Sequence, residues 1–142
     1  MWIGLPLDET GDAHVTVVIR HEDVRQQLMQ DALHAFVAPL LPIRAVIKPG
    51  IVMKGYNGDV PTMDVAFLEP EKELALKRIY ATYYKQKPEF TAYPELSLHL
   101  TVDSPQRLAV ATRILTEFDG KWIATRATLK EIGDKRVIDQ TL

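Results

Sequence analysis

The chain has 142 residues, of which 46% are hydrophobic and 25% are charged, and its formal net charge is -2. This size and composition are typical of one globular domain, and the net charge argues against broad binding to duplex nucleic acid, which needs many cations to neutralise phosphates. Because the chain has no cysteine, disulfide bonds, thiolate catalysis and cysteine-based zinc sites are excluded.

Hydrophobic periodicity divides the first half of the chain into one helix and four strands. A helix is indicated where apolar residues recur every three to four positions, and a strand where they alternate with polar residues. Pro39 and Pro42 would end the helix, and the Asn57-Gly58-Asp59 turn would join the last two strands as a hairpin. In chain order we expect a strand over 13–19, a helix over 23–38, and strands over 43–48, 51–56 and 62–68.

The second half repeats these patterns and completes an α+β chain. Ser104-Pro105 supplies the N-cap and the first position of a helix, and Gly120 follows its end. In each half, a strand is followed directly by a helix, which indicates a weak internal duplication. In chain order we expect a helix over 70–84, a strand over 95–102, a helix over 105–118, and a final hairpin of strands over 121–131 and 135–138.

Two of the four histidines lie in the same local pattern. His14-Val15-Thr16-Val17 and His99-Leu100-Thr101-Val102 both fall on expected strands that precede expected helices. Along a strand, successive side chains point to opposite faces, so the apolar residues would enter the core and the His and Thr residues would lie together on the other face. If both strands are central, the two H-x-T motifs line whatever lies opposite the core.

Paired H-x-[ST] motifs on strands resemble those of the 2H phosphoesterase superfamily, which includes 2′-5′ RNA ligase-like proteins, cyclic nucleotide phosphodiesterases and viral enzymes that cleave antiviral oligonucleotides. The resemblance covers most of the chain in motif spacing, order of elements and size. It implies a single bilobal domain over 1–142, with two antiparallel sheets related by a pseudo-two-fold axis around a central cleft and with the helices outside. It also implies that His14 and His99 are the catalytic pair, that Thr16 and Thr101 hold phosphate oxygens, and that no metal or other cofactor is used.

This chemistry is consistent with the properties of the side chains. Imidazole has an unperturbed pKa near 6.5, so one His can take a proton from the nucleophile while the other gives a proton to the leaving oxygen. Threonine hydroxyls can donate hydrogen bonds to the nonbridging oxygens of phosphate. Two positions depart from the family pattern: Leu98 stands where many members have Pro, and Asp103 stands where many have Arg. By strand alternation Asp103 points to the same side as His99 and Thr101, and it would repel phosphate if it faced the cleft. The alternative is that it lies at the strand end and caps the following helix.

The expected substrate is a small nucleotide phosphodiester: a 2′,3′-cyclic phosphate, a 2′-5′ linkage or a cyclic oligonucleotide signal. The compact size resembles the small viral members most, which favours a phage enzyme that degrades cyclic oligonucleotide signals of bacterial defence. No apolar segment approaches the roughly 20 residues of a membrane helix, and no signal peptide is evident, so we expect a cytoplasmic protein without a membrane partner.

Residues outside the two motifs are candidates for substrate binding. Tyr93 is the favoured residue for stacking on a base, because it lies in the loop that leads into the second motif strand, and Tyr56 is a second aromatic candidate. Arg20 and Lys48 are candidate phosphate donors, and an ordinary role as surface charges is the alternative for each. Trp2 fits two positions, packed on the core or covering the mouth of the cleft, and the sequence does not choose between them.

Two other interpretations remain at this level. The same cleft could sequester a nucleotide without cleaving it, although intact His and Thr pairs argue against this. The motifs could also be coincidental in an α+β scaffold, and then His14 and His99 would lie far apart or be buried with separate partners.

Overall fold

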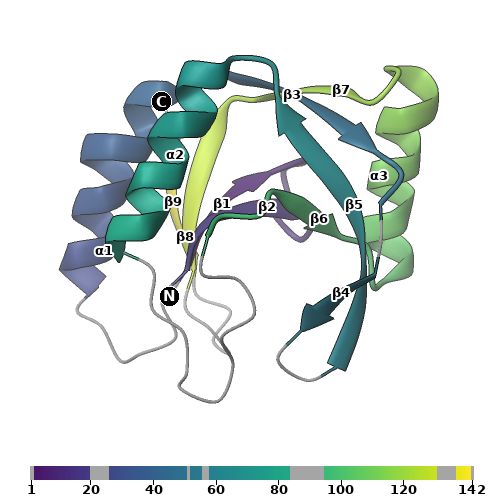
Figure 1. Ribbon diagram of the computed structural model, residues 1–142, viewed down its shortest axis with the longest axis horizontal. Helices are drawn as coiled ribbons and strands as arrows, with labels where there is room; N and C mark the ends of the chain where they lie inside the picture. The colour runs from purple at the N-terminus through teal and green to yellow at the C-terminus, as the bar shows by residue number, and fades with distance from the viewer. Residues whose placement is uncertain are drawn as a thin grey trace.

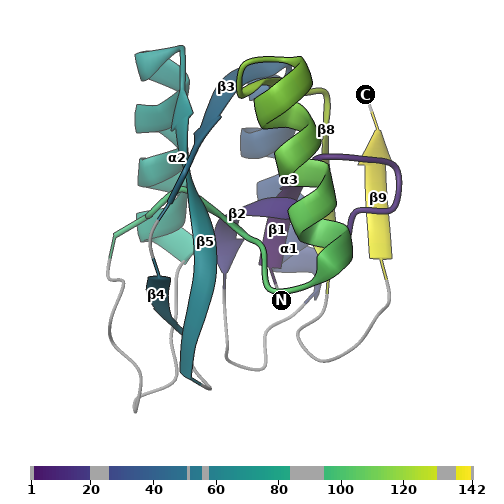
Figure 2. The ribbon, with the colours of Figure 1, turned by 90° about the vertical axis from the view of Figure 1, so that its right-hand side faces the viewer.

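The computed structural model describes residues 2–19, 26–50, 52–55, 58–83, 95–130 and 137–141 (Figure 1). The fold is α+β, as expected, with an antiparallel sheet that is nearly barrel-shaped and three helices. Helices α1 and α2 lie on one side of the sheet and α3 lies on the other, so β5 runs between α2 and α3 (Figure 1, Figure 2).

The strands are β1 (Trp2–Pro6), β2 (His14–Ile19), β3 (Ile43–Lys48), β4 (Val52–Gly55), β5 (Gly58–Phe67), β6 (His99–Thr101), β7 (Lys121–Ala124), β8 (Arg126–Lys130) and β9 (Val137–Thr141). The helices are α1 (Gln26–Ala32), α2 (Pro70–Tyr83) and α3 (Pro105–Glu117). Helix α1 continues into a π-helical turn (Leu33–Val37) and a 3-10 turn (Ala38–Leu40). Within the described residues, no helix has the length and apolar character needed to cross a membrane.

The strands form one hydrogen-bonded sheet, which corrects the expectation of two separate sheets. Its order is β7-β3-β5-β6-β2-β1-β8-β9, with β4 paired to β5, and all pairs are antiparallel. The physical reason is the backbone pairing of β2 with β6 at Val15 and Leu100, which joins the two halves at their centre. The two motif strands are therefore neighbours in the middle of the sheet.

One face of the sheet carries the hydrophobic core. Val15 of β2 and Leu100 of β6 are fully buried, and the motif side chains before and after each of them alternate to the opposite face, where they are half-buried. Burying each large apolar side chain contributes about 1.5–3 kcal/mol, so the alternation fixes which face of each motif strand reaches solvent. On the side of α1 and α2, the helical segments contribute Met29, Leu33, Leu76 and Tyr80 to the core cluster. On its own side of the sheet, α3 contributes Ala111 and Ile114.

Strand β1 was not predicted from the sequence. It contains Gly4 and Pro6, two residues that weaken a strand pattern, and it is only five residues long. Its place between β2 and β8 compensates for this weakness, because the backbone of β1 forms hydrogen bonds with both neighbouring strands. The side chains of Ile3 and Leu5 are also fully buried.

The expected strand over 121–131 is two strands in different parts of the sheet. Strand β7 pairs with β3, whereas β8 pairs with β1 and β9, and the chain leaves the sheet at Thr125 between them. The apolar alternation continues through this break, so the pattern alone predicts one strand. The second motif strand is also shorter than expected, since regular pairing covers only His99–Thr101. The N-terminus of the first expected helix and the turn of the final hairpin lie outside the described residues.

Gly120 provides a test of the turn that ends α3. Its φ is +78°, and a Cβ at this position would lie 2.4 Å from the backbone oxygen of Ile47. We expect Gly120→Ala to lower the free energy of unfolding by about 3 kcal/mol. The alanine would both strain the backbone and place its Cβ against the backbone oxygen of Ile47 in β3. Urea denaturation measures this change.

Gly11→Ala is the matched control. Gly11 has a similar φ of +71°, but a Cβ there would meet its nearest neighbour at 3.5 Å, which is ordinary contact. This variant should lose only about 1–2 kcal/mol from backbone strain. Equal losses for the two variants would mean that the Ile47 carbonyl moves aside freely, contrary to the expectation.

Candidate active site

The two H-x-T motifs lie side by side on one face of the sheet. The pairing of Val15 with Leu100 is antiparallel, so continuing its register by one residue in each direction sets every motif His opposite the other motif's Thr. All four side chains are half-buried, in contrast to the fully buried pair between them. Directly opposed Cβ atoms in such strands are about 4.5–5.5 Å apart, and diagonal ones about 7–8 Å. The two cross-strand pairs are His14 with Thr101, and Thr16 with His99.

Both histidines make the same backbone hydrogen bond. Nδ1 of His14 bonds to the carbonyl oxygen of Asp12 at 3.0 Å, and Nδ1 of His99 bonds to the carbonyl oxygen of Ser97 at 2.8 Å. A carbonyl oxygen can only accept, so Nδ1 carries the hydrogen in both rings and Nε2 is left to accept or release a proton. Among the described residues, neither Nε2 atom has a hydrogen-bond partner. The two rings are thus held in equivalent tautomers by the residue two positions upstream.

Arg107 connects the segments that carry the two motifs. Its Nε and Nη2 donate to Oδ1 of Asp12 at 3.3 and 3.2 Å, and its Nη1 donates to Oδ1 of Asp103 at 2.9 Å. Asp12 precedes β2 and Asp103 follows β6, so one guanidinium holds both strand ends. Asp103 therefore has a cationic partner, which answers the concern that its charge would repel phosphate. Arg107 was missed in the sequence, although its spacing of four residues from Asp103 is a signal for a helical ion pair.

Trp2 covers His14. The two ring centroids are 4.1 Å apart with an interplanar angle of 20°, and Nζ of Lys130 lies 5.5 Å from the centroid of the Trp2 ring. Gly4 makes room for this arrangement, because a Cβ there would lie 2.5 Å from Cζ3 of Trp2 and 3.4 Å from Cδ2 of His14. The sequence left open whether Trp2 packs on the core or lies at the site, and the structure places it against His14.

The environment of His14 lowers its pKa to about 4. Burial is the largest cause, since desolvation disfavours the charged imidazolium, and the positive charges of Arg107 and Lys130 act in the same direction. The hydrogen bond to the Asp12 carbonyl and the Asp12 charge oppose the shift only in part. His14 is consequently neutral near pH 7, with Nε2 available as a proton acceptor.

Lys48 is the predicted substrate-binding residue that the structure describes. It is exposed at the end of β3 and pairs in register with Asp64 of β5, which in turn pairs with His99 of β6. Directly opposed residues share a face, so Lys48 lies two strands away from His99 on the same side of the sheet. The other predicted binding residues lie outside the described part of the chain: Arg20, Tyr56 and Tyr93.

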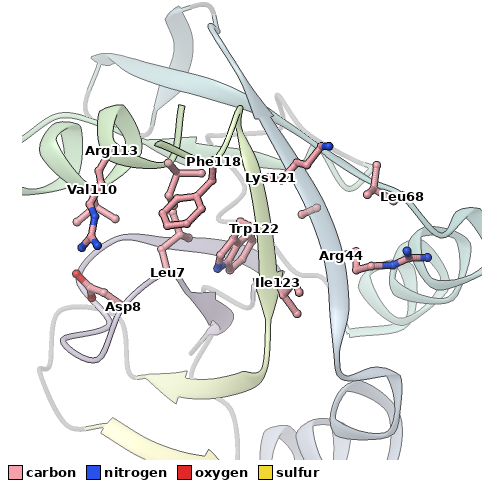
Figure 3. Close-up of a pocket in the computed structure, with 12 residues that line it drawn as sticks. Leu7, Asp8, Arg44, Leu68, Val110, Arg113, Phe118, Lys121, Trp122 and Ile123 are labelled. Atoms are coloured by element: carbon pink, nitrogen blue, oxygen red, sulfur yellow. The ribbon is translucent and has the colours of Figure 1, made fainter. Parts of the chain in front are cut away.

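A cavity of about 830 Å³ lies at a different place, between α3, β7 and the start of the loop after β1 (Figure 3). Leu7, Phe118 and Trp122 point toward one another within it, and none of the four motif residues lines it. Its lining contains no histidine, and its one carboxylate is Asp8. This cavity therefore lacks the acid and base that the motif strands supply.

Comparison of the chain with protein-family models, with curated proteins and with solved structures gave no match. In the described ranges, no three His, Asp or Glu side chains gather in a geometry suited to a metal ion. The arrangement of the motif residues and their neighbours is therefore the feature that bears on function.

The low pKa of His14 predicts a loss of stability in mild acid. In the unfolded chain His14 has its ordinary pKa near 6.5, so the unfolded state takes up a proton first as the pH falls. Stability should therefore decrease between about pH 6.5 and pH 4, by up to about 3 kcal/mol from this residue, and the decrease should level off below the folded pKa.

Urea denaturation of the wild type and His14→Gln across this pH range isolates the effect, because all other titrating groups are shared. The difference in unfolding free energy between the two proteins should change steadily between pH 6.5 and 4. Trp2→Ala, which admits water to the imidazole, should raise the pKa of His14 toward 6.5, as followed by NMR. A constant difference between wild type and His14→Gln would contradict the burial of this ring.

Proposed function

We propose that this chain is a metal-independent phosphodiesterase of the 2H type, which hydrolyses a phosphodiester in a small nucleotide. The observation that carries the proposal is the pair of imidazoles on adjacent strands, each with Nδ1 bound to the carbonyl two residues upstream and each opposite a Thr of the other motif. This arrangement leaves two equivalent Nε2 atoms and two hydroxyls on one face. It matches what in-line displacement at phosphorus requires: a base, an acid and donors to the nonbridging oxygens.

His14 is assigned as the general base and His99 as the general acid. The neutral form of His14 is favoured by burial and by two nearby cations, so its Nε2 takes the proton from the attacking water. As the new O–P bond forms, the ester P–O bond breaks, and protonated His99 gives its Nε2 proton to the leaving oxygen. Proton exchange with solvent then restores both rings. A bound phosphate anion opposes the field of the cations and makes His14 a stronger base than it is in the free protein.

Thr16 and Thr101 are assigned to the nonbridging oxygens. Each lies directly opposite one of the histidines, so a phosphate between the two rings is within reach of both hydroxyls. Donors aimed at oxygens that gain negative charge stabilise the transition state more than the ground state.

The order of strands supports a bilobal arrangement around this site. Strands β2 and β6 form the centre, each is followed by a helix, and each has one further neighbour, β1 and β5 respectively. Each of these two central strands carries one of the matched histidine bonds, which is consistent with a pseudo-two-fold axis between β2 and β6. The proposed lobes are then the β1–β8–β9 side with α1 and the β5–β3–β7 side with α3.

Substitution of the motif residues tests the proposal. We expect His14→Ala and His99→Ala each to lower kcat by about 10²- to 10⁴-fold, because each removes one proton transfer. Thr101→Val should cost about 10²-fold, as for the loss of one donor to a charged oxygen. His34→Ala, which removes an exposed histidine of the π-helical turn, is the control and should leave turnover unchanged.

The assay uses a panel of a nucleoside 2′,3′-cyclic phosphate, a 2′-5′ dinucleotide and cyclic di- and trinucleotides, with products separated by chromatography. EDTA should not change the rate on the substrate that is cleaved. Activity abolished by EDTA would exclude the metal-independent mechanism. Recovery of an intact ligand after tight binding would favour the sequestering function instead.

A further inference from the structure

Lys130 is a half-buried cation held by neutral groups. Its Nζ donates to the carbonyl oxygen of Gly11 at 3.3 Å and lies 5.5 Å from the centroid of the Trp2 ring. Among the described side chains, no carboxylate pairs with it. Removing an ammonium from water without a counter-ion is unfavourable, and a carbonyl and an aromatic face offset this only in part. The ammonium is therefore a favourable place for an anion to bind.

The position of Lys130 is set from two directions. In β8 it pairs in register with Trp2 of β1, and its side chain reaches back to Gly11, which lies three residues before His14. Gly11 adopts a φ of +71°, a left-handed turn that directs its carbonyl to the ammonium. The charge of Lys130 acts on His14, since it contributes to the lowered pKa of that ring. Nζ is thus at the His14 side of the proposed site.

The other cation that acts on His14 is not available in this way. Arg107, the other cation that acts on His14, is already shared between Asp12 and Asp103. Because the H-x-T residues themselves carry hydroxyls and imidazoles only, they supply no permanent positive charge. Lys130 is then the described cation near His14 that remains available to a phosphate group.

We propose that Lys130 binds a phosphate group of the substrate on the His14 side of the site, with the Trp2 ring and the Gly11 carbonyl holding its ammonium in place. This inference rests on the proposed function for the identity of the substrate. The ammonium would bind a phosphate oxygen in either of two cases: the phosphate is the scissile one, or it is a neighbouring one in the same nucleotide.

The first arm of the test measures binding and needs no turnover. The chain has two tryptophans, so in a Trp122→Phe background the fluorescence reports on Trp2, which contacts both Lys130 and His14. Inorganic pyrophosphate is the probe. We expect Lys130→Met to raise its Kd by about 10-fold, consistent with the loss of one charge-assisted contact, and Lys130→Arg to stay within about 3-fold. Lys121→Met, which removes the same charge from exposed β7, should have no effect.

The second arm measures kcat/KM on a cleaved dinucleotide with and without a terminal 5′-phosphate. An equal loss on both substrates in Lys130→Met assigns the ammonium to the scissile phosphate, and a loss confined to the phosphorylated substrate assigns it to the neighbouring one. Equal pyrophosphate affinity in Lys130→Met and Lys121→Met would overturn the inference. If no diester is cleaved but Lys130→Met still weakens pyrophosphate binding, the proposed hydrolysis fails and the anion site stands.

Discussion

The pairing of Val15 with Leu100 is the constraint on which the site depends. Both side chains are fully buried, and together they fix the face and the register of β2 and β6. A slip of one residue would turn the His and Thr side chains into the core and the apolar side chains into solvent. Such a slip is strongly unfavourable, because the free energy gained by burying several apolar side chains would be lost. The same hydrophobic alternation that stabilises the centre of the sheet therefore brings two motifs, 85 residues apart in the chain, into contact.

The site combines a symmetric backbone with asymmetric surroundings. The two imidazoles are oriented by equivalent hydrogen bonds, so neither bond by itself distinguishes an acid from a base. The neighbouring strands make the distinction, because β1 and β8 bring Trp2 and Lys130 to His14, whereas β5 sets Asp64 opposite His99. Desolvation and cations favour a neutral ring at His14. In the proposed mechanism, these different surroundings give two equivalently bonded histidines different proton-transfer roles.

Local patterns predicted the motifs and most elements, whereas tertiary contacts determined the rest. The alternation of apolar residues and the Ser104-Pro105 cap are properties of neighbouring residues, so the motif strands and α3 could be read from the sequence. Trp2, Arg107 and Lys130 reach the site through contacts between distant segments, and no spacing rule links any of them to His14. Strand β1 was missed for a related reason: its glycine weakens the local pattern, and the same glycine provides the space that Trp2 occupies beside His14.

The charges around His14 are consistent with the small substrate that we propose. Asp12 and Asp103 are balanced by Arg107 and Lys130, so this group of side chains has no net charge, and the whole chain is slightly acidic. Long-range attraction of a polyanion is weak under these conditions, since steering by charge requires a field of one sign over an extended surface. In the proposed site, affinity for the substrate would come from direct contacts with hydroxyls, imidazoles and one ammonium. Asp103 keeps Arg107 paired, so in the proposed site the cation that binds a phosphate comes from β8.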